Sequence, residues 1–77
     1  MIFQQRLKEI RIERGFTQVE LAKLVQTTND SVYSWEKGRS QPSIDMIVKL
    51  CVALSVSADY LLGLEREDGT KEYGEFR

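Results

Sequence analysis

The sequence predicts an all-α domain of five short helices. Three observations predict it: apolar residues recur at helical spacing along the chain, Thr or Ser stands in the N-terminal capping position before four segments, and glycines stand where helices would end. At 77 residues the chain holds one domain with one modest core, because a fold this small buries only about 60% of its unfolded surface.

The first helix is expected over residues 3–14, and the second helix after Thr17. Gly15 follows the first helix in the C-terminal capping position, where a left-handed backbone ends many helices. Thr17 and Glu20 have the spacing of a capping box, in which each side chain accepts a bond from the other residue's backbone N–H. The inward residues recur at helical spacing: Phe3, Leu7 and Ile10 on the first helix, and Leu21, Ala22 and Val25 on the second.

The other three helices begin after residues that can cap them: Thr28, Ser43 and Ser57. Val32 and Trp35 are the inward residues of the third helix, and a polar loop over residues 37–42 separates it from the fourth. The fourth helix should be the most apolar and the central one, with these inward residues: Ile44, Ile47, Val48, Cys51 and Leu54. Gly63 ends the fifth helix.

From residue 65 onward the chain is mostly charged and has no helical stripe, a composition that favours disorder. Asp68 and Gly69 could close a two-residue hairpin, but their flanks do not alternate apolar with polar residues, and a lone hairpin is marginal in water. We therefore expect a helical domain over residues 1–64 and a charged tail over residues 65–77 that is flexible or takes part in a dimer.

The composition excludes several classes of protein. With one cysteine no disulfide forms within the chain, and without histidine the usual zinc-finger ligand sets cannot form, so we expect no metal and no other cofactor. We expect no enzyme, because the chain has no Ser–His or Cys–His pair and its glycines form no phosphate-cradling loop. The apolar run at residues 44–56 is too short to cross a bilayer, and the N-terminus has no signal-peptide pattern. We expect a cytoplasmic protein with no membrane partner.

The net charge is unusual for a protein that binds nucleic acid. It is -1, with a pI of about 5.4, whereas phosphate-binding domains are usually basic. The charges are unevenly distributed, because residues 1–42 carry seven Lys and Arg against five Asp and Glu, and residues 43–77 carry four against seven. The half that contains the second and third helices is therefore the basic half.

The turn between the second and third helices is so short that the helices must cross steeply, a geometry with which proteins read duplex DNA. Short motifs around this pair occur in a characteristic order: Arg6-Leu7-Lys8-Glu9, Gly15-Phe16-Thr17-Gln18, Glu20-Leu21-Ala22, Trp35-Glu36-Lys37-Gly38, Pro42-Ser43 and Ala53-Leu54-Ser55-Val56-Ser57. On these motifs residues 6–63 resemble the Cro/repressor-type (xenobiotic-response-element-type) helix-turn-helix family. The resemblance implies a compact five-helix, phage-repressor-like domain in which helices two and three form the helix-turn-helix.

The resemblance also implies which residues contact DNA. Residues at the starts of helices two and three, and in the loop after helix three, would contact phosphates: Thr17, Gln18, Thr28, Lys37, Arg39 and Ser40. Residues on the outward face near the start of helix three would read base edges: Asn29, Asp30, Tyr33 and Ser34. Two alternatives stay open, because the loop cations could simply be solvated, and Asn29 and Asp30 could merely stabilise the helix start.

Arg11 lies four residues after Leu7, beside the inward stripe of the first helix, where a charge needs a partner. The resemblance supplies Glu36 as that partner, in a structural salt bridge. The family often has glycine at the positions of Gln26 and Ser55 in this chain. If the backbone is left-handed there, each of these side chains costs on the order of 1 to 2 kcal/mol.

These features predict a small transcriptional regulator that binds double-stranded DNA sequence-specifically, a repressor that acts as a homodimer on a palindromic operator. A dimer would double the few phosphate contacts that one short domain offers. Apolar residues outside the core could form its interface: Met46, Leu62 and Leu64. The alternative is a protein-interaction module, such as an antitoxin or a phage switch protein, whose protein partner binds the acidic second half.

Overall fold

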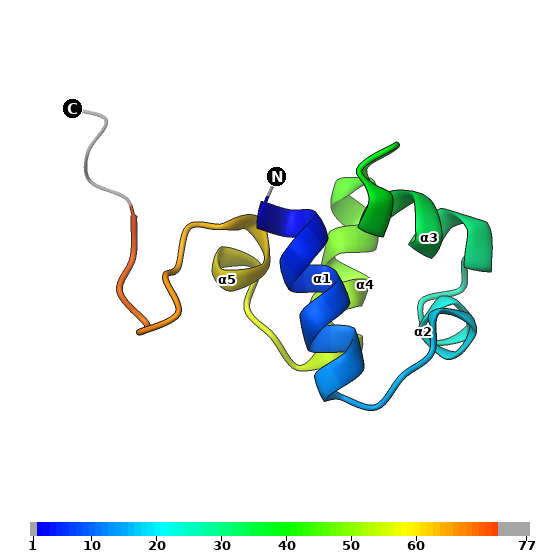
Figure 1. The fold of residues 1–77 in the computed structure, drawn as a ribbon, viewed down its shortest axis with the longest axis horizontal. Coiled ribbons are helices and arrows are strands. Elements are labelled where there is room, and N and C mark those ends of the chain that lie inside the picture. The colour runs from blue at the N-terminus through cyan, green and yellow to red at the C-terminus, as the bar shows by residue number, and fades with distance from the viewer. Residues whose placement is uncertain (1, 73–77) are drawn as a thin grey trace.

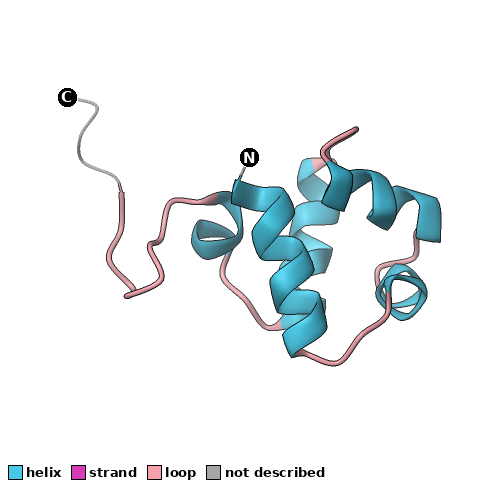
Figure 2. Cartoon of the chain, viewed as in Figure 1, coloured by secondary structure: helices cyan, strands magenta, loops and turns pink. Residues whose placement is uncertain are grey.

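Five helices make up the computed structural model, which describes residues 2–72 (Figure 1 and Figure 2). In chain order they are α1 (Ile2–Glu13), α2 (Gln18–Leu24), α3 (Asn29–Lys37), α4 (Ile44–Leu54) and α5 (Ala58–Leu62). Loops join the helices, and within residues 2–72 the only β pairing is an isolated antiparallel bridge between Glu65 and Lys71. The prediction of an all-α domain with five helices is confirmed. Residues 73–77 of the expected tail lie outside the described residues.

Capping side chains begin four of the helices, as the sequence predicts. Their hydroxyl oxygens accept bonds of 3.1 to 3.2 Å from the backbone N–H three residues further on: Thr17, Thr28, Ser43 and Ser57. At α2 the capping box is complete, because the Glu20 carboxylate accepts from the Thr17 N–H at 2.9 Å, a bond that lowers the pKa of Glu20. Each cap satisfies a backbone donor that the helix itself leaves unpaired, so the chain can begin a new helix after a short turn.

The core lies where α1 meets the other helices. In Figure 1, α2 and α3 lie on one side of α1, while α5 and the described C-terminal end of the chain lie on the other. The buried apolar residues form one cluster, in which these have no exposed surface: Leu7, Leu21, Val32, Leu50, Leu54 and Leu61. The α2–α3 pair is thus held at one end of the domain, with α1 between it and α5.

The inward face of α4 matches the prediction only in part. Leu54 is fully buried and Cys51 packs partly buried against the core, as expected, but Ile44 and Val48, also expected there, are 81% and 58% exposed. Leu50, not expected in the core, is fully buried. Met46, expected outside the core, packs partly buried against it. The helix has apolar residues on every side, so more than one stripe fits helical periodicity, and packing selects the row from Met46 to Leu54. This helix is not the central one either, since α1 contacts both α3 and α5.

Residues 65–72 fold back toward α5, although the composition of this segment favours disorder. The chain turns at Arg66, whose carbonyl accepts a bond from the Gly69 N–H at 3.0 Å. After the turn, the Glu72 N–H donates to the Leu64 carbonyl at 2.6 Å. The turn therefore begins two residues before the Asp-Gly pair that could have closed a two-residue hairpin.

Charged side chains bind this segment to itself and to α5. Lys71 contacts two carboxylates, that of Asp59 on α5 at 3.3 Å and that of Glu65. The hydrogen bond from Lys71 lowers the pKa of the Glu65 carboxyl. Arg66 pairs with Glu72 at 2.9 Å across the turn. Oppositely charged side chains thus contact one another in this segment. The amino-acid composition gives only the number of charged residues and not which of them are in contact.

Two residues other than glycine have a left-handed backbone within residues 2–72. Gln26 follows α2 with φ of 61°, and Ser55 follows α4 with φ of 53°. Both residues are exposed, so neither side chain gains core packing in exchange for the strained backbone. Each left-handed residue with a Cβ costs on the order of 1 to 2 kcal/mol.

Ser55→Gly is expected to raise the free energy of unfolding by about 1 kcal/mol. The substitution removes the strain of a Cβ in the left-handed backbone, and the greater conformational entropy of glycine in the unfolded chain offsets part of this stabilisation. In a domain of this size the melting temperature should rise by about 4 to 8 °C for each kcal/mol. Thermal unfolding followed by circular dichroism measures it. Ser55→Ala is the matched control, since it keeps the Cβ and should not raise the melting temperature. A glycine variant that melts no higher than the alanine variant would contradict the prediction.

Candidate nucleic-acid interface

Three helices meet at the carboxylate of Glu36, a side chain that is only 2% exposed. Arg11 of α1 donates to its two oxygens at 2.6 and 3.0 Å, and Gln18 of α2 donates to Oε1 at 3.1 Å. Arg11 also donates to the Phe16 carbonyl, in the loop between α1 and α2, at 2.8 Å. Arg11 and Glu36 thus form the ion pair that the family resemblance implies. Its charge-assisted bonds fix α3 against both α1 and α2.

The outward face of α3 carries the residues expected to read bases. The inward residues are buried as predicted: Val32 and Trp35. Asn29 and Asp30 in the first turn of the helix are exposed, as is Tyr33 in the next turn, while Ser34 is partly buried. Asn29 and Tyr33 are four residues apart and so lie above one another on the same face of the helix. The core packing of α3 therefore leaves this face available for contact with a ligand.

Two cations lie against the ring of Tyr33. The Lys37 Nζ is 5.6 Å from the ring centroid, and the central guanidinium carbon of Arg39 is 5.5 Å from it. Both distances are within the range of about 6 Å at which an aromatic ring attracts a cation. Tyr33 thus gathers one cation from the last turn of α3 and one from the following loop beside the outward face of the helix.

Gly38 shapes the loop that carries these cations. It ends α3 with a left-handed backbone, φ of 74°, and its N–H donates to the carbonyls of Ser34 and Trp35. A Cβ on this residue would lie 1.5 Å from the Nε2 atom of Gln4 in α1. The left-handed backbone therefore favours glycine here, and a larger residue would also have to displace the end of the Gln4 side chain. The loop continues past Gly38 to Ser40, which is exposed.

The remaining residues expected to contact phosphates lie at the starts of α2 and α3. Thr17 and Thr28 are exposed, and each hydroxyl oxygen accepts a cap bond from a backbone N–H. The hydroxyl of Thr28 also bonds that of Ser31 at 3.0 Å. Gln18 is partly buried and gives one amide proton to Glu36, and an amide has a second proton to donate. Their contacts with phosphate stay predictions.

Arg6 is a buried cation for which no role is predicted from the sequence, although it begins the motif Arg6-Leu7-Lys8-Glu9. Its guanidinium donates to the carbonyls of Tyr60 and Glu65 and lies 4.1 Å from the centroid of the Tyr60 ring. It therefore links α1 to α5 and to the segment after α5. The signal that marks Arg11 could have found it, because Arg6 lies three residues after Phe3 and so beside the inward stripe of α1.

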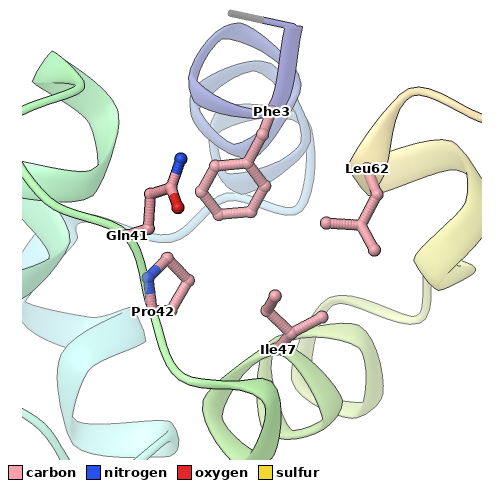
Figure 3. Close-up of a pocket in the computed structure, with 5 residues that line it drawn as sticks. All are labelled: Phe3, Gln41, Pro42, Ile47 and Leu62. Carbon is pink, nitrogen blue, oxygen red and sulfur yellow. The ribbon is translucent and has the colours of Figure 1, made fainter.

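A small apolar pocket opens between α1, α4, α5 and the loop after α3 (Figure 3). Its volume is about 160 Å³, and these residues line it: Phe3, Gln41, Pro42, Ile47 and Leu62. Figure 3 shows the side chains of Phe3, Ile47 and Leu62 pointing into it. Pockets for organic ligands usually measure about 300 to 1,000 Å³, so this one is small for such a ligand.

Metal ions, reactive thiols and membrane contacts are other features that a small domain can have. Within residues 2–72, no group of three or more His, Cys, Asp or Glu side chains is placed to hold a metal ion. Burial raises the pKa of the Cys51 thiol, which keeps the thiol protonated. None of the helices in the described part of the chain has the length and apolar character needed to cross a membrane.

Sequence comparison relates the chain to known regulators. The family described as helix-turn-helix matches residues 7–61. The HTH-type transcriptional regulator ImmR of Bacillus subtilis (strain 168) is 38% identical over 63 residues, which are 82% of this chain and 50% of ImmR. The chain spans about half the length of two such relatives, 50% of ImmR and 56% of the prophage-derived regulator YonR of the same organism.

Solved structures give the same relationship in three dimensions. The P22 c2 repressor, crystallised with a synthetic operator, superposes with a TM-score of 0.75 at 28% identity over 79% of this chain and 92% of that one. SinR, described as a master regulator for biofilm formation and crystallised with DNA, superposes with a TM-score of 0.73 at 33% identity over 78% of this chain and 97% of that one.

Proposed function

This chain belongs to the helix-turn-helix family, and we propose that it is a small transcriptional regulator that binds double-stranded DNA sequence-specifically, a repressor acting as a homodimer on a palindromic operator. The observation that carries the proposal is the outward face of α3. Exposed polar and aromatic side chains lie there opposite the core residues of the helix and beside the cations Lys37 and Arg39. The DNA complexes of the P22 c2 repressor and of SinR support it.

Base reading is assigned to the first two turns of α3. The amide of Asn29 can bond N6 and N7 of an adenine together, and the carboxylate of Asp30 can accept from a cytosine amine. The ring of Tyr33 can touch a thymine methyl, and Ser34 can bond several base edges. These groups can reach base edges only if the N-terminal end of α3 enters the major groove. The core residues of α3 lie on the opposite face of the helix, so the reading face is free to do so.

Phosphate contact is assigned to the two cations and to the polar residues near the helix starts. Lys37 and Arg39 lie on the same ring and can bind neighbouring phosphates on one strand, with Ser40 next to them. Thr17, Gln18 and Thr28 have protons to donate to the phosphates. These contacts fix the position and orientation of the domain, whereas they carry no sequence information.

The protein-interaction alternative is not favoured. This alternative needs carboxylates of the acidic second half to be available to a protein partner. Several of them form ion pairs within the chain: Asp59 and Glu65 with Lys71, and Glu72 with Arg66. In Figure 1 this segment lies on the opposite side of α1 from α3, so it leaves the proposed DNA surface uncovered.

Selection of tight binders from random duplex DNA tests the proposal directly. We expect a selected motif with two inverted half-sites about one helical turn apart, because a two-fold dimer places its recognition helices in successive major grooves. The same experiment reports sequence preference, symmetry and spacing. A selection that yields no enriched sequence would refute sequence-specific binding, and a single unrepeated half-site would refute the dimer.

Binding should also weaken steeply with salt. The logarithm of the affinity is expected to fall by about 0.9 for each unit of log salt and for each phosphate contacted. Replacing Lys37 and Arg39 with Gln should reduce that slope by about 0.9 for each phosphate that the variant no longer binds, and should weaken all sequences alike. Arg66→Gln is the control for each single replacement, because it also removes one positive charge but lies on the far side of α1 from α3. An unchanged slope in the double variant would show that the two cations are solvated and do not contact phosphates.

A further inference from the structure

An apolar stripe on the outer face of α4 has no partner within the described chain. Ile44, Val48 and Val52 follow one another at intervals of four residues and are 81%, 58% and 76% exposed. Leu24, in the last turn of α2, is also exposed. None of these four residues belongs to the core or to the proposed DNA contacts. Contiguous exposed apolar side chains on a small domain mark an interaction surface.

A shallow groove runs along this stripe between α2 and α4. Its volume is about 430 Å³, and these residues line it: Leu24, Gln26, Val48, Lys49, Val52 and Ala53. The groove lies beside the C-terminal half of α4, while the most exposed apolar residue, Ile44, stands at the N-terminal end of the same helix. One end of α4 therefore has a protruding side chain, and the other end has a hollow.

We propose that this surface is the homodimer interface, with α4 of one copy packed antiparallel against α4 of a second copy. A two-fold axis near Val48 places Ile44 of each copy, four residues before the axis, against Val52 of the other, four residues after it. The protruding Ile44 then meets the hollow beside Val52. The inference rests on the homodimer of the proposed function and names its interface, which replaces the surface around Met46, Leu62 and Leu64 expected from the sequence.

The charges on this face support a second copy rather than another partner. Asp45 and Lys49 are exposed and lie on the same flank of the stripe, because they are four residues apart. In an antiparallel pair of helices, the same flanks of the two copies face each other. The midpoint between Asp45 and Lys49 along the helix is within one residue of Val48. The axis that matches the apolar residues therefore also brings Asp45 of each copy to Lys49 of the other. The face is thus complementary to itself in shape and in charge.

Sedimentation of the full chain without DNA tests the interface. The parent should form a dimer, and Val52→Lys or Ile44→Lys should raise the dimer dissociation constant by about tenfold or more. Ile12→Lys, on an exposed apolar residue of α1, is the matched control and should leave the constant unchanged. A parent that stays monomeric, or a Val52→Lys variant that dimerises like the parent, would overturn the proposal. So would dissociation by Leu62→Lys alone, which would assign the dimer to the pocket side of α5.

A charge exchange distinguishes self-pairing from a loss of stability. Asp45→Lys and Lys49→Asp should each weaken the homodimer, because like charges then face each other across the axis. Mixing the two variants should restore association as a heterodimer in which both contacts are attractive. Two variants that remain monomeric when mixed, while each keeps the helical circular dichroism of the parent, would contradict the antiparallel arrangement.

A cross-link locates the axis. Val48→Cys in a Cys51→Ser background should form a covalent dimer under mild oxidation, since disulfides need Cα atoms within about 7 Å. Ile12→Cys in the same background should not. Failure of the cross-link together with a normal dimer would place the axis elsewhere. These results are independent of DNA: a dimer that selects no DNA sequence refutes the proposed function alone, and DNA binding by a dimer that resists Val52→Lys refutes this interface alone.

Discussion

Arg11→Ala is expected to lower the free energy of unfolding by about 3 to 5 kcal/mol, because removing one partner of a buried ion pair leaves the other charge unpaired. The Glu36 carboxylate, 2% exposed, would keep the Gln18 amide as its side-chain donor, and the Phe16 carbonyl would lose the guanidinium. A domain of 77 residues has a total stability of roughly 4 to 12 kcal/mol. The variant should therefore lose a large part of its stability.

Thermal unfolding followed by circular dichroism measures this loss, at about 4 to 8 °C for each kcal/mol. Glu13→Ala is the control, since it breaks the exposed pair with Arg14 and should cost under about 1 kcal/mol. Replacing Arg11 and Glu36 together with Met and Leu should cost less than Arg11→Ala, because no charge is then left buried. A melting temperature for Arg11→Ala within a few degrees of the parent would show that the pair does not hold α3 in place.

The helix starts could be predicted from the sequence because their signals are local. A cap depends on one side chain and on a backbone N–H three residues away, so Thr17, Thr28, Ser43 and Ser57 could be recognised without knowledge of the fold. The outward face of α3 could be predicted for a related reason. Once Val32 and Trp35 are placed in the core, helical periodicity places Asn29 and Tyr33 on the other side.

The inward face of α4 could be predicted only in part: helical spacing places Cys51 and Leu54 correctly, but not Ile44 and Val48. The helix offers apolar residues in several directions, and the choice among them depends on the neighbouring helices. The same ambiguity concealed the exposed stripe from Ile44 to Val52. The path of the segment after α5 could not be predicted, because it is held by ion pairs between residues distant in the sequence, such as that of Lys71 with Asp59. Composition, which favours disorder, contains no information about which charges meet.

The cation pair on Tyr33 shows which part of the candidate site lay beyond the sequence. Lys37 lies four residues from Tyr33 on the same helix, so their contact follows from helical spacing. Arg39 lies beyond the end of the helix and reaches the ring because the left-handed Gly38 turns the chain. The glycine marks the end of the helix in the sequence, but the position of Arg39 over the ring is seen only in the folded structure.

Asn29→Ala is expected to relax the base preference at one base pair in each half-site, at a cost of about 1 to 3 kcal/mol per half-site. The reason is that an asparagine amide can form two hydrogen bonds with adenine that alanine cannot form. The alternative role, stabilising the helix start, is carried by Thr28, whose hydroxyl accepts the cap bond from the Ser31 N–H. The fold should therefore tolerate the change at Asn29, since alanine is a better helix former.

Selection from random duplex DNA, carried out in parallel on the parent and the variants, measures the change in preference. Thr28→Ala is the informative control, because it removes the cap, costs about 1 kcal/mol of stability, and should weaken binding to all sequences without altering the selected motif. Asn29→Ala should do the reverse: it should keep the melting temperature of the parent and lose preference at one position. If instead Asn29→Ala selects the same motif as the parent and melts lower, Asn29 serves the helix start and base reading belongs to the other residues on this face.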